Sequence, residues 1–118
     1  MKTNSIAAVM VHVPDSKVGL DWYSRAFPEA KRVQLPEFEF ECLNINGINL
    51  EVVPADEKVG SGAVGIAVDW LVEDFDRAFE HLTSLGATLY RGPGKIENGW
   101  RMCKLKDPFG NLLGLRGP

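Results

Sequence analysis

The turn sequence near the end of the chain, Asp107-Pro108-Phe109-Gly110-Asn111, constrains the fold more than any other feature. Asp, Pro and Gly at its first, second and fourth positions are typical of a type I turn whose glycine adopts a positive φ. Apolar residues alternate on both sides of it, at Cys103 and Leu105 before the turn and at Leu113 and Leu115 after it. This alternation predicts two short strands joined in a hairpin, each with one apolar face.

The rest of the chain repeats one order of elements, a strand, a helix and three strands. In the first half we expect strands at 6–13, 31–35, 38–45 and 48–53, and a helix that Asp15 or Ser16 caps and Pro28 stops. In the second half we expect a strand at 63–69, a helix over 71–85 ended by Gly86, a strand at 88–91, a flexible loop at 92–99, and strands beginning at Trp100 and Asn111. The helices bury apolar stripes, namely Val18, Trp22, Tyr23, Ala26 and Phe27 in the first and Phe75, Ala78, Phe79, Leu82 and Leu85 in the second. The prediction is one α+β domain of two βαβββ modules, at about 5–54 and 63–117, with a linker at about 55–62.

Asn46-Gly47 predicts a two-residue hairpin turn, and such a turn fixes which residues face one another. On one face of the hairpin Leu43 lies opposite Leu50, which makes this face suitable for covering with the helix. On the other face Cys42 lies opposite Glu51. A carboxylate is therefore expected on the face that the helix does not cover.

Composition excludes several classes of function. The chain has 118 residues and a formal net charge of -3, and no basic stripe that would favour binding to nucleic acid. The apolar run 6–13 is too short to span a bilayer, so we expect no membrane association and a cytoplasmic location. Cys42 and Cys103 lack the spacing of a metal or redox motif, and we expect reduced, half-buried thiols.

The module order and four short segments resemble the vicinal oxygen chelate superfamily, which includes glyoxalases, bleomycin resistance proteins and extradiol dioxygenases. The segments are Val13-Pro14-Asp15 before Trp22-Tyr23, Val68-Asp69 opening the second helix, Leu85-Gly86-Ala87 closing it, and the terminal Asp107–Asn111 turn. The resemblance implies a curved mixed sheet around a cleft, formed within one chain or across a homodimer, with the helices on the outer face.

The resemblance also implies four positions for metal ligands, at Ala8, Glu51, Ala63 and Gly114. Alanine and glycine have no ligating side chain, so only Glu51 could contribute. Because transition metals require three or four protein ligands, we expect no metal here. We expect no other cofactor either. One carboxylate with waters would hold a divalent ion only weakly.

His12 shares a strand face with Ala8 but lies about 13 Å from it along the strand. This distance excludes His12 from the usual metal position. In the related enzymes this part of the strand contacts substrate, which makes His12 a candidate ligand-binding group or proton shuttle. The alternative is a hydrogen-bonded structural histidine.

Strand alternation predicts which residues line the cleft. Small residues lie at its centre: Ala8, Ala63, Gly65, Ala67 and Gly114. The candidate ligand-binding residues are Met10, His12, Phe40, Cys42, Asn49, Glu51, Trp100, Met102, Lys104 and Arg116, with Val53 and Leu112 beside them. Trp100 either stacks on a planar ligand or caps the core.

These residues favour a metal-free, ligand-binding homodimer whose partner is a small organic molecule or an antibiotic. The alternative is a lyase or dioxygenase that uses Glu51 with a weakly held divalent metal, or Glu51 and His12 in metal-free acid–base catalysis. A third interpretation is a protein-interaction module whose cleft is filled by its own side chains.

Overall fold

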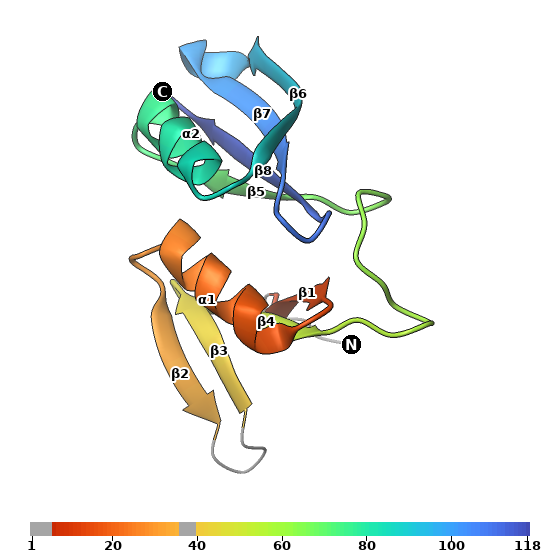
Figure 1. The fold of residues 1–118 in the computed structure, drawn as a ribbon. Coiled ribbons are helices and arrows are strands. Elements are labelled where there is room, and N and C mark those ends of the chain that lie inside the picture. The colour runs from red at the N-terminus through yellow and green to blue at the C-terminus, as the bar shows by residue number, and fades with distance from the viewer. Residues whose placement is uncertain (1–5, 36–39) are drawn as a thin grey trace, which may run out of the picture. The chain divides into compact units, whose positions relative to one another are not determined.

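The computed structural model describes residues 6–35 and 40–118. The chain divides into two compact units, Met1–Gly60 and Ser61–Pro118, and each contains one βαβββ module (Figure 1). This confirms the predicted fold class. In the described residues no helix is long and apolar enough to cross a membrane.

The first unit is a four-stranded sheet covered on one face by one helix. Its elements are β1 (Ala8–Val13), α1 (Ser16–Ala26), β2 (Lys31–Leu35), β3 (Phe40–Ile45) and β4 (Ile48–Pro54). The strand order is β1-β4-β3-β2, in which β1 runs parallel to β4 and the other neighbours are antiparallel. Residues 38 and 39 of the predicted third strand lie outside the described residues.

The hairpin between β3 and β4 has the predicted register. Leu43 lies opposite Leu50, and Asn44 lies opposite Asn49. Asn46 and Gly47 have φ angles of 49° and 90°, and both values are those of the expected two-residue turn.

Helix α1 begins at its predicted cap, where the Asp15 carboxylate accepts hydrogen bonds from the backbone N–H groups of residues 17 and 18. Trp22, Tyr23 and Ala26 are buried, as predicted. The prediction for Val18 was wrong: this residue is 54% exposed, because at this turn of the helix the neighbouring Gly19 is the residue that packs against the sheet. The helix packs very close to the sheet at Gly19, where a Cβ atom would lie 2.8 Å from methyl groups of Val13 and Val52.

The second unit repeats this arrangement with β5 (Val68–Leu71), α2 (Phe75–Ser84), β6 (Thr88–Lys95), the 3-10 turn η2 (Glu97–Gly99), β7 (Arg101–Lys106) and β8 (Leu112–Gly117). The strand order is β5-β8-β7-β6, with β5 parallel to β8. Phe75 and Leu82 of α2 are fully buried against this sheet. Gly86, with a φ of 99°, ends the helix as predicted.

The terminal turn between β7 and β8 forms as its sequence predicts. The carboxylate of Asp107 is buried and accepts hydrogen bonds from the N–H groups of Phe109 and Asn111, at 2.8 and 2.9 Å. Gly110 has a φ of 91°. The Asn111 side chain extends the network by accepting from the N–H of Gly62 at 2.9 Å.

Three predicted boundaries in the second unit were wrong. The first strand is 68–71 rather than 63–69, because the residues that pair with β8 begin at Val68. The helix starts at Phe75 rather than near 71, because the Asp74 side chain caps it and accepts from the N–H of Arg77. Strand β6 continues to Lys95, so residues 92–95 are not a flexible loop, although their pairing with β7 is irregular.

Cys42 and Cys103 are free thiols, as expected. Both are fully buried rather than half-buried, with exposed fractions of 0% and 2%. Burial raises the pKa of the Cys42 thiol, and the charges of Glu51 and Glu41 raise it further.

Candidate functional site

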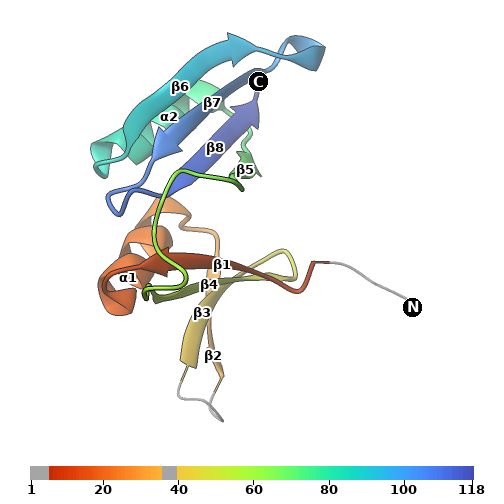
Figure 2. The same cartoon turned by 90° about the vertical axis from the view of Figure 1, so that its right-hand side faces the viewer.

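Each sheet has a helix-free face, which we define as the face opposite its helix. In the first unit Val13 and Val52 contact α1, so the alternate residues Met10, His12 and Glu51 belong to the helix-free face. In the second unit Figure 2 shows α2 behind β6, β7 and β8, which leaves the near face of that sheet without a helix. The predicted ligand-binding residues divide between these two faces.

The helix-free face of the first sheet is mostly uncharged. Asn44 lies opposite Asn49 and donates a hydrogen bond to it at 2.8 Å. Met10 is 55% exposed, and its neighbour across the strands is Glu51. His12 and Phe40 are partly buried, and Cys42 is completely buried, so the thiol is not accessible to a ligand from this unit's surface.

The helix-free face of the second sheet carries an ion-pair cluster, which we call the Asp69 cluster and which consists of Asp69, Lys104 and Arg116. Lys104 Nζ donates to Asp69 Oδ1 at 2.5 Å. Arg116 donates to Asp69 Oδ2 through Nε at 3.1 Å and through its second guanidinium nitrogen Nη2. The three side chains come from three different strands, β5, β7 and β8.

The electrostatics of the Asp69 cluster favour an ionised carboxylate. Its side chain is only 18% exposed, and this burial alone would raise the pKa of Asp69. The hydrogen bonds and charges of Lys104 and Arg116 outweigh the burial, so the pKa of Asp69 lies below its ordinary value. Asp69 is therefore held as an anion between two cations.

The Asp69 carboxylate lies directly over Gly114, its partner on β8. A Cβ atom built on Gly114 would lie 1.8 Å from Asp69 Oδ1 and 3.0 Å from Lys104 Nζ. No real side chain fits at such a separation, so the sequence must have glycine at position 114 as long as Asp69 keeps this conformation. The space that a side chain at position 114 would need is already filled.

The strand pairing corrects one of the four positions that the resemblance gave for metal ligands. The first module places Ala8 seven residues before its helix cap, Asp15. The cap of α2 is Asp74 rather than Asp69, so the same spacing leads to Ala67 and not to Ala63. The strand pairing leads to the same residue. Glu51 pairs with Met10, which lies two residues after Ala8, and the equivalent Gly114 pairs with Asp69, which lies two residues after Ala67.

The residues at these positions do not fit a tightly bound transition metal. Ala8 and Ala67 have no donor atoms, and the Asp69 carboxylate excludes any side chain at Gly114. Within residues 6–35 and 40–118, no group of three or more His, Cys, Asp and Glu side chains lies close enough together to hold an ion. Asp69 itself is occupied by two cations, which would repel a metal.

The structure brings together three of the predicted second-module residues, Met102, Lys104 and Arg116. Arg116 contacts the Sδ atom of Met102 at 3.5 Å, and Asp69 binds both Arg116 and Lys104. Other predicted residues lie outside the strands. Trp100 precedes β7 and is partly buried, and its carbonyl oxygen accepts from the N–H of Ile96 at 2.8 Å. Ala63 and Gly65 precede β5 and do not belong to a strand.

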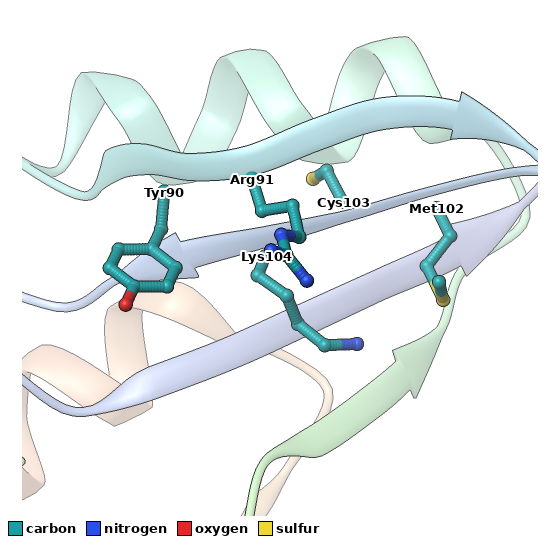
Figure 3. A pocket seen from close by; sticks show the side chains of 5 residues that line it. All are labelled: Tyr90, Arg91, Met102, Cys103 and Lys104. Carbon is teal, nitrogen blue, oxygen red and sulfur yellow. The ribbon is translucent and has the colours of Figure 1, made fainter. Parts of the chain in front are cut away.

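A hollow of about 320 Å³ lies on the second sheet between β6 and β7, lined by Tyr90, Arg91, Met102, Cys103 and Lys104. Figure 3 shows the Arg91 and Lys104 side chains extending beside one another from adjacent strands. Sequence reasoning identified Met102 and Lys104 but missed Asp69, Tyr90 and Arg91. The sequence did contain a signal for Asp69. A second aspartate, Asp74, lies directly before the apolar stripe of the helix and caps it, which leaves Asp69 to the preceding strand.

Comparisons with known proteins match this architecture. The model of the Glyoxalase/Bleomycin resistance protein/Dioxygenase superfamily matches residues 5–115. A solved structure of a member of that superfamily from Sphaerobacter thermophilus is 20% identical, with a TM-score of 0.75 and coverage of 98% of each chain. A family enzyme from Burkholderia phytofirmans is 15% identical, with a TM-score of 0.72 over 94% of this chain and 96% of that one.

A third similar structure is TioX from Micromonospora sp. ML1, which is 22% identical with a TM-score of 0.69 over 97% of this chain and 98% of that one. At these identities the likenesses show the shared fold. A comparison with curated proteins found no match.

Proposed function

Because the chain belongs to the Glyoxalase/Bleomycin resistance protein/Dioxygenase superfamily, as its terminal turn and module order predicted, we propose that it is a small-molecule-binding member that works without a tightly held metal ion. The ligand is an organic molecule, and antibiotics are one class of candidate. The helix-free face of each sheet offers binding groups of its own.

The observation that carries this proposal is the position of the Asp69 carboxylate over Gly114. A metal-dependent member of the family would need a donor side chain at that position of β8. Here the space is filled by an acid that is neutralised by Lys104 and Arg116. Together with Ala8 and Ala67, this leaves Glu51 as the one donor among the four positions.

Each face by itself has groups that suit an organic ligand with an apolar body and a few polar atoms. Met10 provides an exposed, adaptable apolar surface on the first face. Asn44, Asn49 and Glu51 provide hydrogen-bonding groups next to it. The second face provides Met102 beside the cations of the Asp69 cluster.

The test has two measurements on the full chain. The first is the metal content of protein purified without chelator, equilibrated with Zn²⁺, Ni²⁺, Fe²⁺ and Mn²⁺, and then dialysed. We expect far less than one equivalent of each metal. The second is a thermal-shift screen of planar, anionic and cationic organic molecules, including antibiotics, on chelator-treated protein.

We expect at least one compound to raise Tm in the screen, since a ligand at 100 times its Kd stabilises the folded state by about 2.7 kcal/mol. Stoichiometric metal retention, or ligand binding that chelation abolishes, would contradict metal independence. A screen in which no compound raises Tm would contradict ligand binding.

The second candidate is an enzyme that uses Glu51 and His12. It is favoured by their register, because Glu51 pairs with Met10 and His12 pairs with Val53, which places both side chains on the helix-free face two residues apart along the paired strands. If the screen yields a compound that is turned over, Glu51→Gln and His12→Asn should each abolish turnover while binding persists. Unchanged turnover in both variants would exclude this mechanism.

A further inference from the structure

The helix-free face of the second sheet is positively charged although the whole chain is negative. Its strand residues include one carboxylate, Asp69, against four cations, namely Arg91, Lys104, Lys106 and Arg116. The formal net charge of the chain is -3, so this excess does not follow from overall composition. Neighbouring like charges on paired strands destabilise a sheet. Arg91 and Lys104 are direct strand partners.

Within the described residues, Arg91 differs from the other three cations because its side-chain charge has no ion-pair or ring partner. Lys104 and Arg116 are bound to Asp69, and Lys106 lies over the ring of Tyr90, 5.0 Å from its centre. In the part of the chain that the structure describes, Arg91 forms no ion pair, and it is exposed at the hollow. An arginine presents a planar fork of donors that matches a carboxylate in two parallel hydrogen bonds.

An irregularity in β6 places Tyr90 and Arg91 together. Leu89 pairs with Leu105 and Arg91 pairs with Lys104, so two steps along β6 correspond to one step along β7, which is the count of a β-bulge at Tyr90. In a regular strand consecutive side chains point to opposite faces. Figure 3 instead shows Tyr90 and Arg91 extending from the same side of β6.

The hollow therefore combines one unpaired guanidinium with apolar walls. Tyr90 contributes a ring on one side of Arg91, and Met102 contributes a thioether on the other side of Lys104. The volume of about 320 Å³ is that of a small-ligand site. A ring and a thioether suit a planar apolar group that carries the acid.

We infer that this hollow binds an organic carboxylate, with Arg91 pairing the carboxylate and with Tyr90 and Met102 contacting the apolar body. The inference rests on the proposed function and adds the chemical class of the ligand and the residues that select it. Lys104 contributes its charge while it stays hydrogen-bonded to Asp69. The face selects against cationic ligands, since Asp69 is already neutralised.

The experiment follows the methyl groups of the methionines by NMR, with [¹³C-methyl]Met in the full chain at low ionic strength. The Met102 signal is assigned with Met102→Leu, and Met10 on the first sheet serves as an internal control. The probes are phenylacetate, its neutral analogue phenylacetamide, and the cation benzylamine. The variants are Arg91→Gln and, as the matched control, Arg77→Gln, which removes the same charge from an exposed position on α2.

We expect phenylacetate to shift the Met102 signal saturably, with a Kd in the millimolar range for so small a probe. Phenylacetamide and benzylamine should leave that signal in place. Arg91→Gln should weaken phenylacetate binding about tenfold or more, because it removes the cation that pairs with the carboxylate of the probe. Arg77→Gln should weaken it less than about twofold, because Arg77 lies on α2, on the opposite face of the sheet.

Equal shifts with phenylacetate and phenylacetamide, equal effects of the two variants, or a response confined to Met10 would each overturn the inference. In those cases the proposed function still stands if the thermal-shift screen finds a ligand. Loss of every response in both experiments would overturn the two proposals together.

Discussion

At the strand pair beside the candidate site, the first module carries Met10 and Glu51, whereas the second carries Asp69 and Gly114. The two modules have the same strand order, so these pairs occupy equivalent places. The acid lies on β4 in the first module and on β5 in the second. One scaffold therefore supports a carboxylate on either strand of the pair, provided that the facing residue leaves room for it.

The neighbouring strand decides what each acid does. In the first module the Glu51 charge lies near the buried Cys42 thiol and contributes to raising its pKa, after burial itself. In the second module Asp69 meets Lys104 and Arg116. Glu51 is consequently available to a ligand, while Asp69 is a positioning group that fixes two cations on its face.

The largest expected effect is that of a side chain at position 114. Gly114→Ala should lower the free energy of unfolding by about 2 to 3 kcal/mol, because the new Cβ displaces the Asp69 carboxylate and breaks its ion pairs. Urea denaturation followed by tryptophan fluorescence measures the change.

The matched control is Glu51→Ala at the equivalent position of the first module, where a partly exposed acid is shortened and nothing is displaced. Its cost should stay within about 0.5 kcal/mol. Equal costs for the two variants would mean that the two positions do not differ in packing.

A smaller effect is expected for Asp69→Asn, which keeps the shape of the side chain and removes its charge. The loss at pH 7 should be about 1 to 2 kcal/mol, since the cluster is partly exposed and retains weaker hydrogen bonds.

The pH dependence of the free energy of unfolding shows whether the ionised Asp69 carboxylate is the group that stabilises the fold. The pKa of Asp69 is lower in the folded protein than the value of about 3.9 expected in an unfolded chain. Its stabilisation is therefore complete above that value and is lost as pH falls through the lower, folded one. The difference in unfolding free energy between wild type and Asp69→Asn should be constant above about pH 5 and shrink below about pH 4. A difference that does not change with pH would contradict the ion pairing.

The two modules should differ least in the reactivity of their thiols, because burial raises the pKa of both Cys42 and Cys103. Iodoacetamide at pH 7.5 should alkylate neither thiol in the native protein and both in urea, as mass spectrometry of the products would show. Rapid alkylation of Cys42 alone in native protein would mean that the helix-free face of the first sheet opens to solvent.

Local signals in the sequence sufficed where a turn or cap is made by neighbouring residues. Asn46-Gly47 and the Asp107–Asn111 turn formed as predicted, because their backbone angles and hydrogen bonds come from the turn residues themselves. The register of the first hairpin followed from its turn, and the structure adds a hydrogen bond between the paired Asn44 and Asn49.

The sequence could not reveal features that depend on pairing between distant strands. Asp69 was expected at the end of the strand 63–69, where it would open the second helix. The structure instead places it within β5, paired with Gly114 of β8, and the helix is capped by Asp74. The bulge at Tyr90 depends on the register between β6 and β7, so alternation alone could not place Tyr90 and Arg91 on one face.

A double-mutant cycle between positions 69 and 114 tests the central claim, that the Asp69 carboxylate fills the space a side chain on Gly114 would need. We predict that Gly114→Ala costs about 2 to 3 kcal/mol in the wild-type background, and about 1 kcal/mol in Asp69→Asn, where a full-sized side chain still occupies the space but the ion pairs are already lost. In Asp69→Ala, where the space is cleared, the cost should be less than about 0.5 kcal/mol. The same cost in all three backgrounds would contradict the account.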